Sequence, residues 1–288
     1  LRLTLLGPSE KEFDDWGTEP GLKREWLNCG TFFALKDAND EVREVRSFFE
    51  LVPFINDRAC LADCTIERLA VDQFRLTSGA DSIDVTLDQD EQVAPPYRVT
   101  TDYVRSGLVK FGVEVLGGAS GFSADQPSTG FALCFNGNYL LIDAIPYVEW
   151  HLKARGISRN QVAAIFLTHL HDDHCNMFPL MLMPHKLDVI TTREIYAMAM
   201  RKLSMGLGWT ESAVMEHFNF VEIRDGHTLN YYGMEIIAHH PIHSIPTVGA
   251  VFRAHWQGRA YEICLVGDIQ TFSDIAQMRE QALVRCET

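Results

Sequence analysis

The feature that most constrains this chain is a short apolar run, residues 163–167, that leads directly into a segment rich in histidine and aspartate, residues 168–175. The apolar run predicts a buried strand, and the segment after it reads Thr-His-Leu-His-Asp-Asp-His-Cys. A loop leaving a strand end can aim several side chains at one point, whereas a strand alternates them between two faces. Imidazole and carboxylate groups suit zinc, manganese and iron. Because burying so many polar groups without a partner is costly, the segment indicates a metal site in preference to a solvated loop.

Composition narrows the possible functions. The 288 residues are 47% hydrophobic, enough for one large domain or two smaller ones with a sizeable core. The net charge of −14 argues against general nucleic-acid binding, which needs a basic face. No apolar run approaches the length of a membrane span, and the first residues lack the layout of a signal peptide. Seven scattered cysteines show no disulfide framework, so we expect reduced thiols and a cytoplasmic location.

The chain is expected to have two parts, an accessory α+β region at 1–106 and a second domain at 107–288. The composition changes most strongly near 81–96, where a predicted strand at 82–87 precedes an acidic loop or linker at 88–91. In the accessory region helices are expected at 40–51 and 60–69, with Cys60 and Cys64 as a half-buried pair on one helix face.

The second domain alternates strand and helix patterns. Strands are expected at 109–116, 131–135, 139–142, 163–167, 187–190, 221–223, 234–239, 248–253 and 261–266, and helices at 146–155, 192–205 and 211–218. The Asn-Gly-Asn sequence at 136–138 predicts a hairpin turn. Strands that alternate with helices and later form hairpins indicate mixed sheets with helices outside, a layered α/β sandwich.

Three more predicted strands end in polar residues. His239, His240 and His243 follow one strand, Asp268 follows another after Gly267, and Asp143 follows a third. One aspartate at a strand end is weak evidence, because a turn or cap explains it. Four polar strand ends in one chain form a pattern, and if these edges converge they build a dinuclear metal site.

From about residue 109 to 270 the chain resembles the metallo-β-lactamase fold superfamily. The resemblance is carried by four stretches in the family's order, Leu-Leu-Ile-Asp at 140–143, Thr-His-Leu-His-Asp-Asp-His at 168–174, Pro-Ile-His-Ser-Ile-Pro-Thr-Val-Gly at 241–249, and Gly-Asp at 267–268. It implies a four-layer αββα sandwich that is incomplete at its C-terminal end, preceded by the accessory region.

The resemblance also implies a ligand set and cofactors. The implied metal ligands are His169, His171 and His243 for a first metal, Asp173 and His174 for a second, and Asp268 bridging both. Asp143 and Thr168 would hold a ligand or a backbone group in place. The implied cofactors are two divalent metal ions, zinc in the first place, with manganese or iron as alternatives.

One departure concerns the second metal. The family supplies a further histidine well after the bridging aspartate, and this sequence has no histidine after Asp268. Either the chain is truncated or its second site is completed differently. His185, His239 and His240 are conceivable substitutes, although an ordinary surface or orienting role is the favoured interpretation of each.

The resemblance implies a dinuclear metal-dependent hydrolase, and the stretch at 241–249 bears on its substrate. The sequence after His243 is more similar to the phosphodiesterase and transfer-RNA-processing branches, which favours a small-molecule phosphodiester such as a small or cyclic nucleotide. A metal-bound hydroxide would attack, and Asp173 would be catalytic by orienting it or accepting its proton. An arginine should contact the phosphate, and the sequence leaves three candidates open, Arg193, Arg224 and Arg253.

Two other functions stay open. The same fold carries non-haem diiron centres that bind, sense or reduce dioxygen, but these usually have a carboxylate where this chain has His171, which favours hydrolysis. A metal-free interaction module on a decayed scaffold is the third interpretation, and the intact cluster argues against it. We expect no membrane association. A homodimer is a further expectation, because the accessory region needs a partner to cover it.

Overall fold

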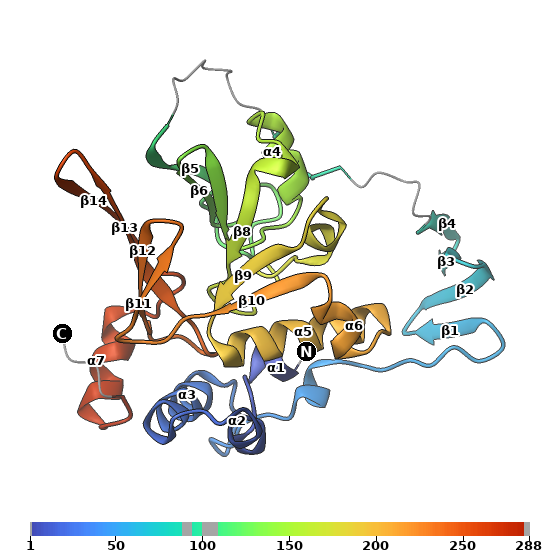
Figure 1. The fold of residues 1–288 in the computed structure, drawn as a ribbon. Helices are drawn as coiled ribbons and strands as arrows, with labels where there is room; N and C mark the ends of the chain where they lie inside the picture. The colour runs from blue at the N-terminus through green and yellow to red at the C-terminus, as the bar shows by residue number, and fades with distance from the viewer. Residues whose placement is uncertain (1, 88–93, 100–108, 285–288) are drawn as a thin grey trace. The chain divides into compact units, whose positions relative to one another are not determined.

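A computed structural model describes residues 2–87, 94–99 and 109–284, drawn from blue to red in Figure 1. The chain separates into two compact units. One combines residues 1–42 with residues 95–288, and the other consists of residues 43–94. The predicted boundary at residue 106 stays a prediction, because residues 100–108 lie outside the described part.

The larger unit contains a six-stranded mixed sheet. Its strands are β5 (Phe111–Gly117), β6 (Gly130–Phe135), β7 (Asn138–Ile142), β8 (Val162–Phe166), β9 (Leu187–Thr191) and β10 (Phe218–Glu222). They lie in the order β10-β9-β8-β7-β6-β5. The strands from β7 to β10 are parallel, while β5, β6 and β7 form antiparallel hairpins. The β6–β7 turn is the predicted one, with both Asn136 and Gly137 at positive φ.

A second sheet of four antiparallel strands belongs to the same unit. It comprises β11 (Thr228–Tyr231), β12 (Met234–His239), β13 (Gly249–Trp256) and β14 (Arg259–Leu265), in that order. In β12 every second residue is buried, as a sheet with one covered face requires. Phe252 of β13 and Phe166 of β8 meet edge to face with ring centroids 5.2 Å apart, so the hydrophobic core joins the two sheets.

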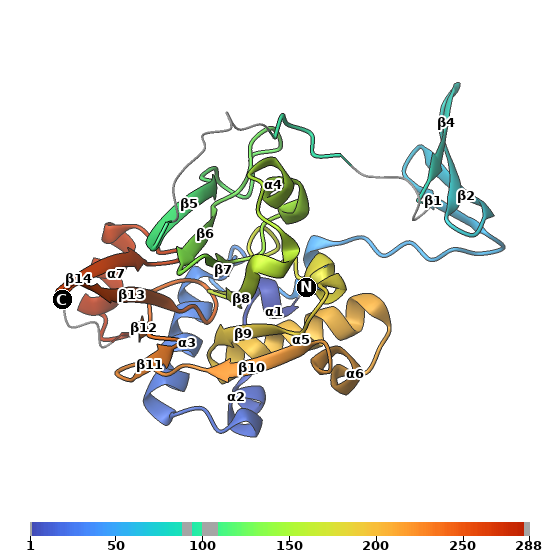
Figure 2. The same ribbon diagram turned by 45° about the horizontal axis from the view of Figure 1, so that its top comes forward.

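Helices follow the strands of the larger unit. They are α4 (Val148–Ala154), α5 (Arg193–Leu207), α6 (Glu211–Met215) and α7 (Phe272–Glu280). Helix α5, predicted at 192–205, has Thr192 as its N-cap and packs against β9, as Figure 2 shows. The metallo-β-lactamase-like α/β sandwich expected from the sequence is thereby confirmed. Strand β11 and helix α7 were not predicted. None of the helices in the described ranges has the length and apolar character that crossing a bilayer requires.

Residues 2–33 contain three helices that pack on the rest of this unit. They are α1 (Arg2–Leu5), α2 (Glu10–Trp16) and α3 (Pro20–Phe33). Glu12 of α2 accepts a hydrogen bond of 2.7 Å from Arg201 of α5, and Thr18 donates one of 2.8 Å to buried Glu194. These helices therefore belong with the sandwich by contact, although the sequence analysis assigned them to the accessory region.

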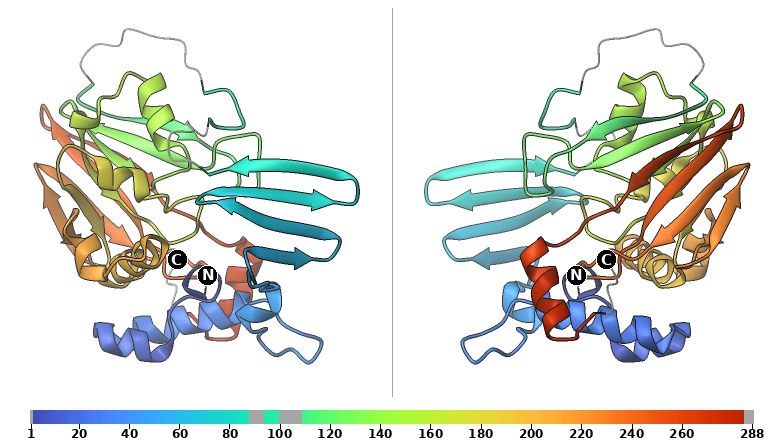
Figure 3. Two further views of the ribbon diagram at one scale, coloured as in Figure 1. Left: turned by 90° about the vertical axis from the view of Figure 1, so that its right-hand side faces the viewer. Right: turned by 90° about the vertical axis from the view of Figure 1, so that its left-hand side faces the viewer.

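The smaller unit is a four-stranded antiparallel meander, shown in cyan in Figure 3. Its strands are β1 (Arg58–Leu61), β2 (Cys64–Ala70), β3 (Gln73–Ser78) and β4 (Asp81–Thr86). The predicted strand at 82–87 corresponds to β4. The predicted linker at 88–91 lies outside the described residues.

Two helix predictions in this unit were wrong. Residues 60–69 form the β1–β2 hairpin, so Cys60 and Cys64 lie on neighbouring strands. Residues 40–51 contain a 3-10 turn at Val45–Phe48 and an isolated bridge at Val42 in place of the predicted helix. The reason lies in the turns. Ala62, Asp72 and Gly79 take positive φ between runs of four to seven residues, and such short runs of β-branched and polar residues can pair but are too short for stable helices.

Candidate metal centre

The histidine-rich loop leaves β8 at Thr168 and turns back within a few residues. Thr168 and His169 are fully buried, and the backbone N–H groups of His174 and Cys175 both donate to the carbonyl of His171. The carbonyl of His174 accepts a hydrogen bond of 2.7 Å from the N–H of Ala144, just past β7. Two adjacent parallel strands thus hold the loop, and its side chains project from one edge of the sheet.

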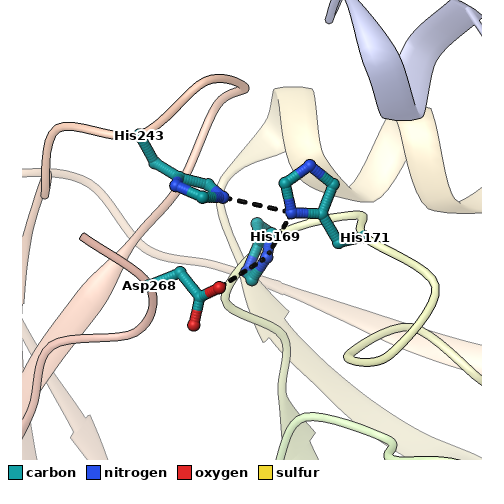
Figure 4. A group of neighbouring side chains, drawn as sticks. All are labelled: His169, His171, His243 and Asp268. Carbon is teal, nitrogen blue, oxygen red and sulfur yellow. Dashed lines mark hydrogen bonds and ion pairs between the residues drawn. The ribbon is translucent and has the colours of Figure 1, made fainter. Parts of the chain in front are cut away.

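Four candidate ligands from three segments converge at this edge, as Figure 4 shows. Nδ1 of His171 lies 3.1 Å from Nε2 of His169 and 3.1 Å from Nε2 of His243. Oδ2 of Asp268 lies 3.9 Å from Nε2 of His169. One donor atom from each of these side chains falls within 4.8 Å of all the others. The structure therefore brings together the four residues expected to hold and bridge the first metal.

A second group of donors lies on the other side of Asp268. Nε2 of His174 is 3.4 Å from Oδ1 of Asp268 and 3.3 Å from Oδ2 of Asp173. The two oxygens of Asp268 thus face different histidines, Oδ2 toward His169 and Oδ1 toward His174. A carboxylate with this orientation is suited to bridge two cations.

Asp143 and Thr168 fix the proton positions on two of the imidazoles. Thr168 donates its single hydroxyl proton to Oδ2 of Asp143 at 2.7 Å, so its oxygen must accept from Nδ1–H of His169 at 2.8 Å. Nδ1 of His174 lies 2.8 Å from the same Oδ2 of Asp143. Both hydrogen bonds orient a ring so that Nε2 is left to bind a cation, the arrangement found around metal-bound histidines.

Burial governs the protonation of the first group. Burial lowers the pKa of His169 well below its usual value and also lowers the pKa of His171. The pKa of His243 falls to about 3, because burial is joined by the neighbouring imidazoles of His171 and His174. A buried imidazole that resists protonation keeps a lone pair available for a metal.

The second group carries a different charge. Burial would lower the pKa of His174, but hydrogen bonds with Asp143 and Asp173 overcome it and raise the pKa to about 10. Burial raises the pKa of Asp268, although the nearby His174 acts in the opposite direction. Burial would also raise the pKa of Asp173, but its hydrogen bond with His174 prevails and lowers it. Without a cation the charge on His174 balances the carboxylates, so binding of a metal here would be coupled to release of a proton.

The donor set fits divalent cations of the zinc, manganese or iron type. It offers imidazole nitrogen and carboxylate oxygen, partly or fully buried and already oriented. Asp143, His169 and His174 also lie close enough to form a metal group. However, Oδ2 of Asp143 already accepts from Thr168 and His174, so we assign Asp143 to hydrogen bonding.

Several residues that the sequence analysis missed support the ligands. Lys202 of α5 donates to the carbonyl of Leu170 at 3.2 Å and pairs with Asp172 at 2.5 Å, which fixes the loop from outside. Nε2 of the Gln270 amide lies 3.4 Å from Nδ1 of His243. Because Nδ1–H needs an acceptor when Nε2 binds a metal, the amide of Gln270 would then present its oxygen instead. No local pattern signals either contact, since each partner lies far away in the sequence.

A glycine lies against the carboxylate of Asp173. A Cβ added at Gly121 would fall 2.2 Å from Oδ2 of Asp173, so that only glycine fits there without movement. Ser128 donates to the backbone carbonyl of Asp173 at 3.1 Å. The glycine-rich segment 117–121 is apparent in the sequence, but nothing in the sequence shows that Gly121 lies against Asp173.

The loop that carries His243 rests on the N-terminal helices. Trp26 of α3 packs edge to face on His240 at 5.2 Å, and a Cβ at Gly30 would lie 3.7 Å from the carbonyl of Ser244. Cys29 and Ile242 share a small hydrophobic cluster with Met278 of α7. The position of His243 therefore depends on a part of the chain that showed no ligand motif.

The three histidines considered as substitutes make other contacts. Nε2 of His185 lies 2.9 Å from the carbonyl of Val162, at the opposite end of β8 from His169. Nδ1 of His240 lies 3.2 Å from the carbonyl of Thr247, and His239 lines a cavity of about 810 Å³ beside α3.

The candidate arginines also have partners. Arg193 and Arg224 both hydrogen-bond to Glu222, and Arg253 pairs with Glu235 and Glu262. Arg193 and Arg224 line the same cavity as His239, and Arg253 projects from β13. The choice among the three for a phosphate contact stays open.

Two curated proteins are similar to this chain. Both relatives come from Dictyostelium discoideum. The cGMP-dependent 3',5'-cGMP phosphodiesterase A is 27% identical over 151 residues, 52% of this chain and 17% of that protein. The cAMP/cGMP-dependent 3',5'-cAMP/cGMP phosphodiesterase B is 27% identical over 176 residues, 60% of this chain and 16% of that protein. This chain therefore spans less than a fifth of either relative.

Solved structures and a family model also match. The metallo-β-lactamase fold protein YhfI from Bacillus subtilis is 19% identical, with a TM-score of 0.43 over 54% of this chain and 61% of that one. The short form of human tRNase Z is also 19% identical, with a TM-score of 0.42 over 54% of this chain and 68% of that one. The family model described as "Anti-Pycsar protein Apyc1" matches residues 111–286, more than half of the chain and all of the sandwich from β5 onward. By that match, the chain belongs to the Apyc1 family of anti-Pycsar proteins.

Proposed function

We propose that this chain is a metal-dependent phosphodiesterase that hydrolyses a small phosphodiester such as a cyclic nucleotide, using two divalent cations. The observation that carries the proposal is the orientation of Asp268, whose two oxygens face His169 at 3.9 Å and His174 at 3.4 Å. His171 and His243 lie on the His169 side, and Asp173 lies beside His174. The donors therefore form two adjacent sets that share the carboxylate of Asp268.

Each part of the site has a distinct task in this proposal. Bound divalent cations would polarise the phosphoryl oxygens and lower the pKa of the attacking water. His169, His171 and His243 would hold one cation, and His174 with Asp173 the other. Asp143 and Thr168 would keep Nε2 of His169 and His174 directed inward, through the hydrogen bonds that they make to Nδ1.

Asp173 is the proposed proton acceptor. Hydrolysis adds a water oxygen to phosphorus and breaks one P–O ester bond, so a proton must leave the attacking water and another must reach the departing oxygen. Hydrogen bonding lowers the pKa of Asp173, which keeps its carboxylate ionised and ready to orient the water or accept its proton. Gly121, which has no side chain, leaves the space that this carboxylate occupies beside the site.

The proposed substrate class is supported by the net charge of the chain and by its sequence similarity to the two curated relatives. Both curated relatives are named as cyclic-nucleotide phosphodiesterases, and the aligned parts overlap the domain that carries the site. The net charge of −14 disfavours a long polyanion and is compatible with a small nucleotide held by cations. The site with a histidine at position 171 favours hydrolysis over a dioxygen-binding diiron centre.

The proposal is tested by turnover of 3',5'-cyclic nucleotides with defined metals. Zinc or manganese should restore activity to chelated protein. His171→Ala or Asp268→Ala should lower kcat/KM by at least about 1,000-fold, because the first loses a ligand of one cation and the second loses the carboxylate shared by both. His185→Ala is the matched control, since that imidazole lies at the other end of β8 and should leave the rate unchanged.

Two results would contradict the proposal. Unchanged turnover after complete metal removal would exclude metal-dependent hydrolysis. Bound iron with an absorption spectrum that changes with oxygen, together with no turnover of any phosphodiester, would favour the dioxygen-binding alternative.

We also propose that the chain forms a homodimer through the smaller unit. One face of its sheet carries a continuous apolar row, Ala59, Ile66, Leu76 and Ile83, in register across the four strands. Ile83 is 61% exposed. Within the unit this face is only partly buried, and a four-stranded sheet of that kind is marginal by itself, so a second copy that packs on this face would stabilise it.

A further inference from the structure

An exposed phenylalanine stands beside the metal centre. Phe122 is fully exposed, and it directly follows Gly121, whose Cα lies against the carboxylate of Asp173. Because one residue spans only about 3.5 Å of chain, the ring of Phe122 begins at the rim of the candidate site. Single exposed apolar residues are common on protein surfaces, so the argument rests on this placement and on how firmly the loop is held.

Hydrogen bonds fix the loop that carries Phe122. The N–H of Ala119 donates to the carbonyl of Pro127 at 3.0 Å, and the N–H of Thr129 donates back to the carbonyl of Ala119 at 3.1 Å. At the tip, the N–H of Ser123 donates to the carbonyl of Ser120 at 2.9 Å. The base of this loop is therefore tied on both sides. A ring on an anchored turn loses less conformational freedom on binding a ligand than one on a loose segment.

A second exposed apolar residue directly follows one of the donors in the chain. Ile269, 51% exposed, directly follows Asp268. The carboxylates of Asp268 and Asp173 lie 3.4 and 3.3 Å from one atom, Nε2 of His174. Phe122 thus follows a glycine that lies against the carboxylate of Asp173, and Ile269 follows Asp268. Because both carboxylates contact the same nitrogen, two exposed apolar residues are joined closely along the chain to the polar centre.

We propose that Phe122 stacks on the nucleobase of the substrate while the phosphodiester occupies the metal centre. This inference rests on the proposed phosphodiesterase function and adds the part of the substrate that lies away from phosphorus. Base–aromatic stacking is worth about 1–3 kcal/mol per base and tolerates every base, because each has a flat π-face. A phenyl ring has no hydrogen-bonding group, so this contact distinguishes nucleotides from phosphodiesters without a base, and not purines from pyrimidines.

The first test compares two substrates in matched variants. Phe122→Ala should lower kcat/KM for 3',5'-cyclic nucleotides by about 5- to 100-fold, mainly through KM, and leave turnover of the base-free ribose 3',5'-cyclic phosphate unchanged. Phe122→Trp should restore or exceed the wild-type value. Tyr232→Ala is the control, because Tyr232 is 80% exposed but precedes β12 at the end opposite His243.

A binding measurement keeps this inference separable from the proposed function. The affinity of a phosphorothioate analogue of a cyclic nucleotide should fall in Phe122→Ala by the same factor, with bound metal unchanged. Equal losses for the nucleotide and the base-free analogue would overturn stacking, as would unchanged affinity for both. If wild-type protein turns over no cyclic nucleotide, the proposed function fails, and the base contact is then decided by the affinities alone.

Discussion

The molecule contains two four-stranded antiparallel sheets that share a topology and differ in how their apolar faces are covered. In the sheet β11–β14 the buried face includes Ile236, Ala250 and Phe252, which pack against the six-stranded sheet. In the meander β1–β4 only Ala59 is buried among the described residues of the strands. Alternation of apolar and polar residues therefore makes a strand in both places, but only a facing sheet turns the apolar side into a hydrophobic core.

The largest expected difference between the two sheets concerns a phenylalanine in each. Phe252→Ala should lower the free energy of unfolding of the larger unit by about 3–5 kcal/mol, because it leaves a cavity beside Phe166. Phe74→Ala in β3 should cost less than about 1 kcal/mol, since Phe74 is only half-buried. Urea titration with hydrogen exchange resolved by segment measures both. Similar losses in the two variants would show that the meander has a core of its own.

A smaller effect is expected from Glu12, which ties the N-terminal helices to the larger unit. Burial would raise its pKa, but hydrogen bonds from Arg2 and Ser9 prevail and lower the pKa from 4.5 to about 2. The stabilisation is therefore fully present above pH 4.5 and is lost as the pH falls toward 2. Glu12→Gln should lower the free energy of unfolding at pH 7 by about 1–3 kcal/mol and flatten its pH dependence in that window.

The matched control for Glu12 is Glu10→Gln. Glu10 is an exposed residue on the same helix, with an ion pair of 3.4 Å to Lys23, and its replacement should change little. If both variants respond to pH in the same way, the N-terminal helices are not anchored through Glu12.

The smallest effect on stability is expected at the face of the meander, where association should change instead. Ile83→Lys introduces a charge into the apolar row and should convert the proposed homodimer into a monomer, measured as mass in solution by light scattering. Ser82→Lys is the control, because Ser82 pairs with Thr77 on the opposite, polar face. A monomeric wild-type protein, or equal dissociation in both variants, would contradict the proposed dimer.

The sequence revealed the site better than its surroundings. The segment 168–174 and Asp143 follow strands whose apolar runs are unambiguous, so their convergence at one sheet edge could be predicted. The helix predicted at 60–69 was wrong because short amphipathic runs fit either period, and turn residues such as Ala62 decide between them. The support of His243 by α3, and the contacts of Lys202 and Gly121, arise between segments far apart in sequence and leave no periodic trace.

Asp143 has a consequence for how this centre can change. Its carboxylate touches His174 directly and reaches His169 through the hydroxyl of Thr168, and these two imidazoles belong to opposite halves of the centre. A substitution at this one position would disturb the tautomers of both rings together. The affinities of the two halves cannot be tuned independently from there, and variation that adjusts one cation alone has to arise at outlying contacts such as that between Gln270 and His243.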